Sequence, residues 1–127
     1  MTYAFDVDPI GAPRQSRRDA WNPSAAVVRY RYFRDVLNAR AGDIGYSLGG
    51  DLTVRFEFPM PRSWSAKERE AMRGRPHRQK PDLDNCVKAF TDALARGKDD
   101  AFVWKIGAEK VWSDAGRIVV SDGGAHA

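Results

Sequence analysis

The chain has 127 residues, with 21 Lys and Arg against 17 Asp and Glu, and therefore a net charge of +4. This length predicts one domain with one hydrophobic core, and no apolar run approaches the ~20 residues that a membrane-spanning helix needs. The single cysteine, Cys86, excludes an internal disulfide and argues against a cysteine-ligated zinc site. Because the first residues carry neither the basic nor the apolar region of a signal peptide, we expect a soluble cytoplasmic protein.

The two parts of the chain differ in charge. Residues 13–80 hold 15 Lys and Arg against 7 Asp and Glu, whereas residues 81–127 hold 6 against 8. A basic part joined to a locally acidic segment is typical of a protein that binds a polyanion on one surface and a cation at one position. Arginine can also simply keep a small protein soluble, and the charge alone does not separate these two interpretations.

The N-terminal part predicts a strand, a basic loop and a long helix. Residues 2–7 alternate weakly, as in a strand, and the glycine and prolines of residues 9–13 end it. The loop that follows contains three arginines that either contact phosphate or are solvated: Arg14, Arg17 and Arg18. A helix is predicted from Asn22-Pro23 to a stop at Gly42, because Asn caps helices, Pro is tolerated in the first turn, and apolar residues recur at helical spacing.

The middle of the chain predicts a second strand, a short helix and a basic segment. Residues 52–58 alternate strictly between apolar and polar side chains, so this is the clearest strand, with one face buried. Ser65 and Glu68 have the spacing of a capping box and predict a short polar helix that ends near Arg73. Residues 74–80 form a flexible basic lead-in to the next helix, in which His77 is expected to contact phosphate or solvent.

A second main helix is predicted from Asp84 to Arg96, where Gly97 ends it. Its apolar stripe includes Cys86, which is therefore expected to be a buried packing residue. The polar face of this helix carries, one turn apart, Asp84, Lys88 and Asp92.

The C-terminal residues predict a hairpin. Residues 101–112 are rich in β-branched and aromatic side chains, and residues 117–120 are expected to pair back with them across a turn. Residues 121–127 are predicted to be a disordered tail, which leaves residues 1–120 as the domain. The predicted fold class is therefore α+β, a single small domain in which two main helices pack on one mixed or antiparallel sheet.

Carboxylates gather around the second main helix. Asp82 and Asp84 stand two residues apart at its mouth, Lys88 lies one turn inside it, and Asp99-Asp100 follows its far end. Clustered carboxylates are costly unless a cation lies between them, and Mg²⁺ prefers such oxygen ligands. Bound Mg²⁺ assists phosphodiester hydrolysis by activating water and neutralising phosphoryl charge. The pattern thus predicts a divalent-metal site facing a phosphate backbone, where Lys88 can hold the scissile phosphate.

Each of these charged residues also has an ordinary structural explanation. Asp84 can be a helix N-cap, and Asp82 can be a favourable charge near the positive end of the helix. Lys88 can be an i, i+4 partner of Asp84, and Asp99-Asp100 can be a solvated turn. From the residues alone, these alternatives stay open.

Several motifs together resemble a known family. They are Lys80-Pro81-Asp82-Leu83-Asp84-Asn85, Lys88, Phe90-Thr91-Asp92-Ala93-Leu94, Asp99-Asp100-Ala101 and Lys110, with Gly11-Ala12-Pro13-Arg14 near the N-terminus. In this combination the chain resembles the RusA family of Holliday-junction resolvases, small endonucleases of bacteria and their phages. The resemblance implies that Asp82, Asp84 and Asp100 are catalytic and bind the metal, and that Lys88 is the catalytic lysine.

The resemblance also implies an activity and an assembly. It implies a Mg²⁺-dependent homodimer, with Mn²⁺ expected to substitute, whose two active sites nick opposed strands of a four-way DNA junction symmetrically in recombination and repair. A two-fold dimer suits a junction with matching strands, and the expected location is the cytoplasm of a bacterial or phage-infected cell. The residues expected to bind the DNA are Arg14, Arg17, Arg18, Arg75, Arg78, Lys80 and Lys110.

Two features depart from the family pattern. The segment between Leu94 and Asp99 is short, which leaves open whether Asp99 or Asp100 faces the metal. Phe102 stands where the pattern predicts a polar residue, a change that we expect to affect the local surface or a dimer contact.

Two other functions stay open. A non-catalytic basic module would bind branched or duplex DNA in a salt-sensitive way without nicking it. A restriction-like nuclease would need a Glu-x-Lys motif after Pro81-Asp82, and the downstream candidate, Glu109-Lys110, lacks the intervening residue. The tryptophans are candidates for the core or for a dimer interface, and an exposed one could stack on a base.

Overall fold

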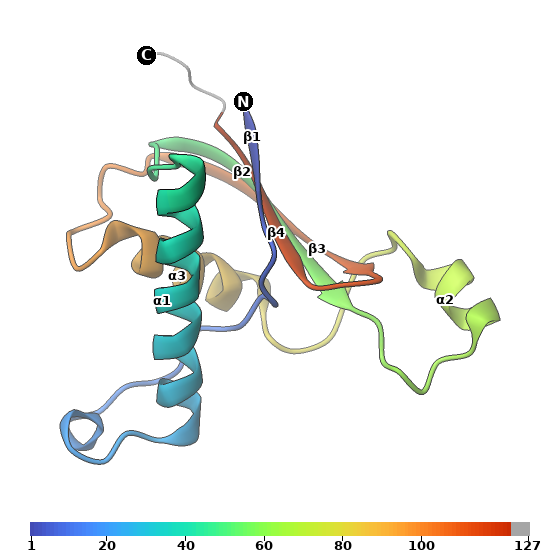
Figure 1. The fold of residues 1–127 in the computed structure, drawn as a ribbon, viewed down its shortest axis with the longest axis horizontal. Coiled ribbons are helices and arrows are strands. Elements are labelled where there is room, and N and C mark those ends of the chain that lie inside the picture. Colours follow the sequence, from blue (N-terminus) through green and yellow to red (C-terminus); the bar gives the residue numbers. More distant parts are fainter. Residues whose placement is uncertain (123–127) are drawn as a thin grey trace.

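A four-stranded sheet forms the centre of the domain (Figure 1). The structure is a computed structural model and describes residues 1–122 of the chain. The strands lie in the order β1–β4–β2–β3 and are β1 (Thr2–Phe5), β2 (Asp51–Pro59), β3 (Lys105–Ser113) and β4 (Arg117–Asp122). Because β2 runs parallel to β3 and antiparallel to β4, the sheet is mixed.

Two main helices, α1 (Ala25–Ile44) and α3 (Leu83–Ala95), contact each other and the sheet. Their apolar stripes close the core, in which the ring of Phe90 from α3 meets Phe5 of β1 and Phe56 of β2 at centroid distances of 6.3 Å. All three rings are fully buried, and burial of such large apolar side chains is the main force that holds helix and sheet together. The predicted α+β class is confirmed, with a short α2 (Ala66–Met72) and a 3₁₀ turn, η1 (Arg17–Ala20), as additions.

The predicted hairpin between the last two strands is wrong. β4 does not pair with β3 but lies between β1 and β2, with Val54 opposite Val120 and Phe56 opposite Ile118. The turn after β3 therefore crosses the end of β2, so that β3 and β4 border β2 on opposite sides. This arrangement gives β4 two neighbouring strands and buries Ile118 and Val120 completely.

Several predicted boundaries shift for local reasons. α1 begins after Ser24, whose hydroxyl accepts a hydrogen bond from Val27 N, and it continues through Gly42 to Ile44. It ends at Gly45, where φ is 71°, a left-handed conformation that glycine adopts at low cost. β3 begins at Lys105 rather than at residue 101, because the chain turns between Asp100 and Val103. The capping box of α2 is confirmed.

The C-terminal boundary also moves. β4 continues to Asp122, so Ser121 and Asp122 belong to the sheet rather than to a tail. The remaining residues of the predicted tail, 123–127, lie outside the described part of the chain.

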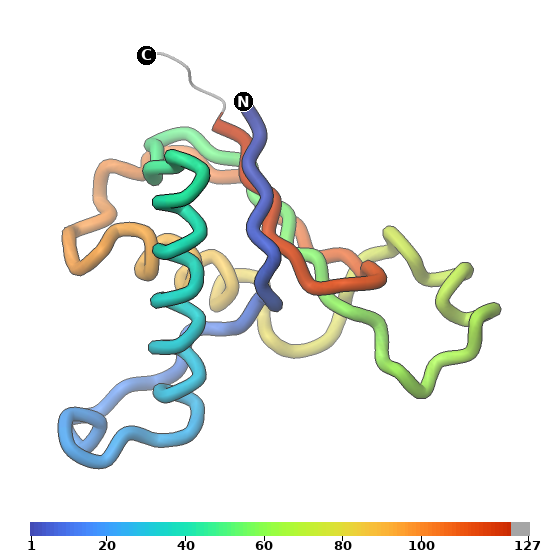
Figure 2. Tube along the Cα trace, viewed as in Figure 1, coloured from blue at the N-terminus to red at the C-terminus, as the bar shows by residue number. Residues whose placement is uncertain are grey.

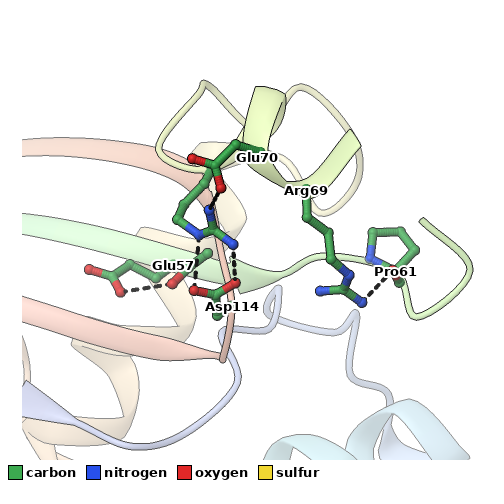
Figure 3. A network of polar contacts seen from close by, with 7 residues as sticks. Glu57, Pro61, Arg69, Glu70 and Asp114 are labelled. Carbon is green, nitrogen blue, oxygen red and sulfur yellow. Dashed lines mark hydrogen bonds and ion pairs between the residues drawn. The ribbon is translucent and has the colours of Figure 1, made fainter. Parts of the chain in front are cut away.

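α2 belongs to an arm, residues 60–76, that extends away from the helices beyond the ends of β2 and β3 (Figure 2). The guanidinium of Arg73 joins α2 to the turn before β4 through Asp114 at 2.9 and 3.0 Å, and Arg69 donates to the carbonyl of Pro61 (Figure 3). Arg73 also lowers the pKa of the Asp114 carboxyl by hydrogen bonding to it. The Arg73 bonds therefore join the arm to the turn before β4, whereas the Arg69 bond lies within the arm.

The root of the arm is an aromatic stack around His77. The imidazole lies 4.0 Å from the ring of Phe58 and 4.4 Å from that of Trp112, and Trp64 packs on Trp112 at 4.9 Å. His77 is only 6% exposed, so the expectation that it contacts phosphate or solvent is wrong. Its backbone N–H donates to Lys110 O, and Pro76 pairs with Val111, so the segment predicted to be flexible lies against β3.

We expect His77 to make the domain less stable in mild acid. Burial, and then the nearby charge of Lys110, lower the pKa of His77 below its usual 6.5, so the folded state resists a proton that the unfolded state accepts. Stability should therefore fall as the pH drops below about 6.5. Thermal unfolding of the wild type and of His77→Phe at pH 7.5 and 5.5 measures this effect. The variant should lose less stability between the two pH values, and equal losses would contradict the assignment.

Candidate active site

Asp82 and Asp84 lie at the start of α3 with their carboxylates exposed to solvent. Asp82 occupies the N-cap position, and its carbonyl accepts from Cys86 N, but its side chain makes no capping hydrogen bond. That carboxylate instead accepts from Lys80 Nζ at 3.0 Å, while Asp84 Oδ1 accepts from Asn85 N at 3.0 Å. Asp84 is therefore not the N-cap, and helix capping does not account for the Asp82 side chain.

Lys88 follows one turn along the same helix. Its Nζ lies 3.6 Å from Asp92 Oδ2, so the i, i+4 contact that α3 makes is with Asp92 and not with Asp84. The opposite face of α3 is buried and contains Cys86, as predicted, together with Phe90. Asp84 and Lys88 therefore lie on the exposed face of a helix whose other face is packed into the core. A preorganised site requires side chains that are attached to such a packed element.

The turn that leads into Asp82 is held from two sides. From β3, Lys110 Nζ donates to Gln79 O and to Pro81 O, both at 2.7 Å. From the N-terminal loop, Ala12 N donates to Asn85 O at 3.1 Å, and Gly11 packs so closely on Pro81 that a Cβ there would lie 2.8 Å from Pro81 Cβ. Lys110 is predicted from the sequence to bind DNA, whereas in the structure its ammonium group donates hydrogen bonds to these two carbonyls.

The second acidic pair lies at the other end of α3. This helix has 13 residues and is therefore ~20 Å long, and the chain reaches Asp99 and Asp100 after leaving its C-terminal end (Figure 1). Asp99 Oδ1 accepts from Ala101 N, and the backbone carbonyl of the half-buried Asp100 accepts from Val103 N. Within residues 1–122, no three His, Cys, Asp or Glu side chains come together as a metal site. One chain thus does not bring Asp100 to Asp82 and Asp84.

The donor set at the start of α3 fits Mg²⁺ in chemistry and in number. Mg²⁺ retains several waters and is usually held by one or two carboxylates, together with oxygens of the substrate. Asp82 and Asp84 supply two exposed carboxylates. The Lys80 contact of Asp82 is itself exposed to solvent, so neither carboxylate is held in a buried ion pair. The residues that would hold the ion from one chain are therefore Asp82 and Asp84.

Apart from Lys110, which lies in β3, the predicted DNA-binding residues fall into two basic segments. The first, residues 14–18, continues from the loop that packs on Pro81, and the second, residues 75–80, leads from the arm into Asp82. The side chains of both segments that are predicted to bind DNA are exposed: Arg14, Arg17, Arg18, Arg75, Arg78 and Lys80. The hydrogen bond from Ala12 N to Asn85 O thus ties the residues just before the first segment to α3, and the second segment leads directly into Asp82.

Asp19 organises the first basic segment, although it is not among the residues predicted for the site. Its carboxylate accepts from Ser16 N at 2.7 Å and from Ser24 N at 3.0 Å, and these bonds lower its pKa. Arg31 of α1 donates to its carbonyl. The signal in the sequence is the Ser-x-x-Asp spacing of Ser16 and Asp19, which is that of a capped turn.

An exposed apolar surface lies on the start of β3 and on the residues just before it. Phe102, Trp104 and Ile106 are 49%, 74% and 36% exposed. β3 is an edge strand, and residues 74–77 pair with it at Lys110 to Trp112, so among residues 1–122 no strand pairs with its outer edge from Lys105 to Glu109. An unpaired edge next to exposed aromatic side chains is a typical surface for association with another chain.

The tryptophans divide into two groups. Trp64 and Trp112 pack at the root of the arm, as expected of core residues. Trp21 and Trp104 are 75% and 74% exposed and lie before α1 and before β3.

Within the described residues, no helix is long and apolar enough to cross a bilayer. A search of curated proteins found no match to the chain. The family model for endodeoxyribonuclease RusA matches residues 6–121, which include β2, β3, nearly all of β4, both main helices and the carboxylates at the start of α3. This match covers nearly the whole chain, and the protein therefore belongs to the RusA family of endodeoxyribonucleases.

Proposed function

We propose that the protein is a Mg²⁺-dependent endonuclease that resolves four-way DNA junctions by paired symmetric nicks in recombination and repair, in the cytoplasm of a bacterial or phage-infected cell. The observation that carries this proposal is the pair of exposed carboxylates, Asp82 and Asp84, held at the start of α3 directly after the basic residues 75–80. Membership of the RusA endodeoxyribonuclease family supports the choice of substrate.

Bound Mg²⁺ would supply an activated water and neutralise charge on the phosphoryl oxygens. Asp82 and Asp84 would hold the ion, and Lys80 would then have to leave Asp82. That ion pair is exposed and contributes about 1 kcal/mol at most, so it is no obstacle to metal binding. Lys80 is then free to bind a phosphate next to the site.

Lys88 stabilises the charge that develops on the scissile phosphate. Its contact with Asp92, at 3.6 Å and exposed, is weak enough to open when the DNA backbone arrives. Since Lys88 is fixed to the same helix as Asp84, phosphate and carboxylate keep one relative position.

Asp100 completes the site from a second copy of the chain. Within one chain Asp100 follows the far end of α3, and no three acidic side chains of residues 1–122 come together. A two-fold dimer removes this separation if the start of α3 in one copy meets the end of α3 in the other. Between the members of the second acidic pair we favour Asp100, because the Asp99 carboxylate already caps the turn at Ala101 N.

The outer edge of β3 is the surface that allows this arrangement. If the β3 strands of two copies pair antiparallel near Gly107, the Lys105 end of one strand lies beside the Lys110 end of the other. Lys110 contacts the turn before Asp82, and Asp100 lies shortly before Lys105, so this pairing brings Asp100 of each copy toward Asp82 of the other. The same pairing covers Phe102, Trp104 and Ile106.

A labelled synthetic four-way junction, incubated with and without Mg²⁺ beside a linear duplex of the same sequence, tests the proposed function. We expect symmetric nicks with 5′-phosphate and 3′-hydroxyl ends on the junction, only when Mg²⁺ or Mn²⁺ is present, and no cutting of the duplex. Salt-sensitive binding of the junction without nicks in either metal would instead identify a non-catalytic DNA-binding module.

A further inference from the structure

Lys110 stands out because its ammonium group donates to backbone carbonyls of its own chain. The half-buried side chain donates to two carbonyls, Gln79 O and Pro81 O, at 2.7 Å each, and the ring of Phe58 lies 6.0 Å from its Nζ. Hydrogen bonds from a charged donor are about twice as strong as those between neutral groups. No carboxylate within residues 1–122 pairs with this lysine, and its ammonium group donates hydrogen bonds to the two backbone carbonyls instead.

The backbone carbonyl of Lys110 also contacts this segment, at His77, two residues before Gln79. His77 N donates to Lys110 O at 3.0 Å, and the His77 ring is stacked on Phe58. One residue of β3 therefore contacts residues 77, 79 and 81 of a segment that is otherwise an exposed loop with no strand or helix of its own. Asp82 is the next residue after the last of these contacts.

We infer that Lys110 is a positioning residue that fixes the turn carrying Asp82, and that it does so by clamping the carbonyls of Gln79 and Pro81 rather than by binding DNA. This inference rests on the proposed function for its catalytic consequence. Without the clamp, the two carbonyls lose a charged donor, and the contacts that remain are backbone bonds on either side of residues 79–81 and the packing of Gly11 on Pro81. Asp82 and Asp84 would then be presented to the metal in a range of positions, and loss of a group that orients a metal ligand costs about 10- to 100-fold in metal affinity or activity.

The test compares Lys110→Met with Lys110→Arg and with Lys67→Met as a matched control. Lys67 is exposed on α2 and takes no part in the site, so its replacement removes one positive charge without touching the turn. Three quantities are measured: hydrogen–deuterium exchange of residues 77–86 in the metal-free protein, junction affinity in the absence of divalent metal, and kcat for junction cleavage as a function of Mg²⁺.

We expect Lys110→Met to speed up exchange in residues 77–86, to lower kcat or raise the Mg²⁺ requirement by about 10- to 100-fold, and to leave junction affinity at the level of Lys67→Met. Lys110→Arg should keep the affinity but not restore kcat, because a planar guanidinium does not place one nitrogen between two carbonyls as an ammonium does. A variant Lys110→Met with unchanged exchange, or a loss of affinity that Lys110→Arg restores, would overturn the inference and make Lys110 a DNA contact. If the wild type does not cleave junctions, the proposed function fails, while the exchange experiment still decides whether the clamp exists.

Discussion

Asp82→Asn should abolish Mg²⁺-dependent cleavage of four-way junctions and leave junction binding intact. The substitution keeps the size of the side chain and the backbone position at the start of α3, but it replaces a charged oxygen ligand by a neutral amide. A metal ion is worth several kcal/mol of transition-state stabilisation, so its loss corresponds to a decrease of about a thousandfold or more in rate. Gel shift without divalent metal and single-turnover cleavage with Mg²⁺ measure the two effects.

Asp43→Asn is the matched control for this experiment. Asp43 is exposed near the end of α1, and its replacement makes the same change in charge and shape away from the site. Asp82→Asn also removes a negative charge from the face expected to meet the DNA, so its junction affinity should equal or exceed that of the control. Resolution of junctions by Asp82→Asn at the wild-type rate would show that the metal site is elsewhere.

Charges placed on the outer edge of β3 should dissociate the dimer and stop cleavage together. In the double variant Trp104→Asp and Ile106→Asp, the two-fold axis brings like charges of both copies into an interface from which water is excluded, at a cost of several kcal/mol. The fold should persist, because Trp104 is 74% and Ile106 36% exposed in the single chain. Sedimentation across a concentration series, far-ultraviolet circular dichroism and junction cleavage measure assembly, folding and activity on the same samples.

Trp21→Asp provides the comparison, because Trp21 is 75% exposed and lies before α1 rather than on β3. This variant should remain a dimer and remain active. A double variant that stays dimeric, or one that becomes monomeric and still cuts both strands of a junction, would contradict the proposed role of the β3 edge.

Patterns within one segment predict the elements of this fold well. The alternation of residues 52–58 predicts a strand and the face of it that is buried. The apolar stripe of residues 83–95 does the same for a helix. For this reason the exposed face of α3 with Asp84 and Lys88 follows from the amino-acid sequence alone. The partner of the last strand does not, because the residues of a strand determine which face is buried but not which neighbour it takes.

The position of the second acidic pair depends on the path of the chain after α3. The sequence predicts the helix that separates the two pairs, but residues 96–100 could span about 17 Å if extended and return toward Asp84. The helix length alone therefore does not decide whether one chain can bring Asp99 or Asp100 to Asp82; the structure shows that no three acidic side chains come together within residues 1–122. The inward positions of His77 and Lys110 depend on how the arm packs against β3, and no local pattern encodes that contact.

Mixed dimers test the central claim, that each active site combines Asp82 and Asp84 of one copy with Asp100 of the other. Asp82→Asn and Asp100→Asn chains with different affinity tags are coexpressed, the mixed dimer is purified through both tags, and its action on a junction labelled on each strand is compared with that of the two parent dimers. Both parents should be inactive. In the mixed dimer one site holds both substitutions and the other holds none, so we predict that it cuts one strand of the junction in Mg²⁺. A mixed dimer as inactive as its parents would show that Asp100 acts within its own chain, and the account of the active site would be wrong.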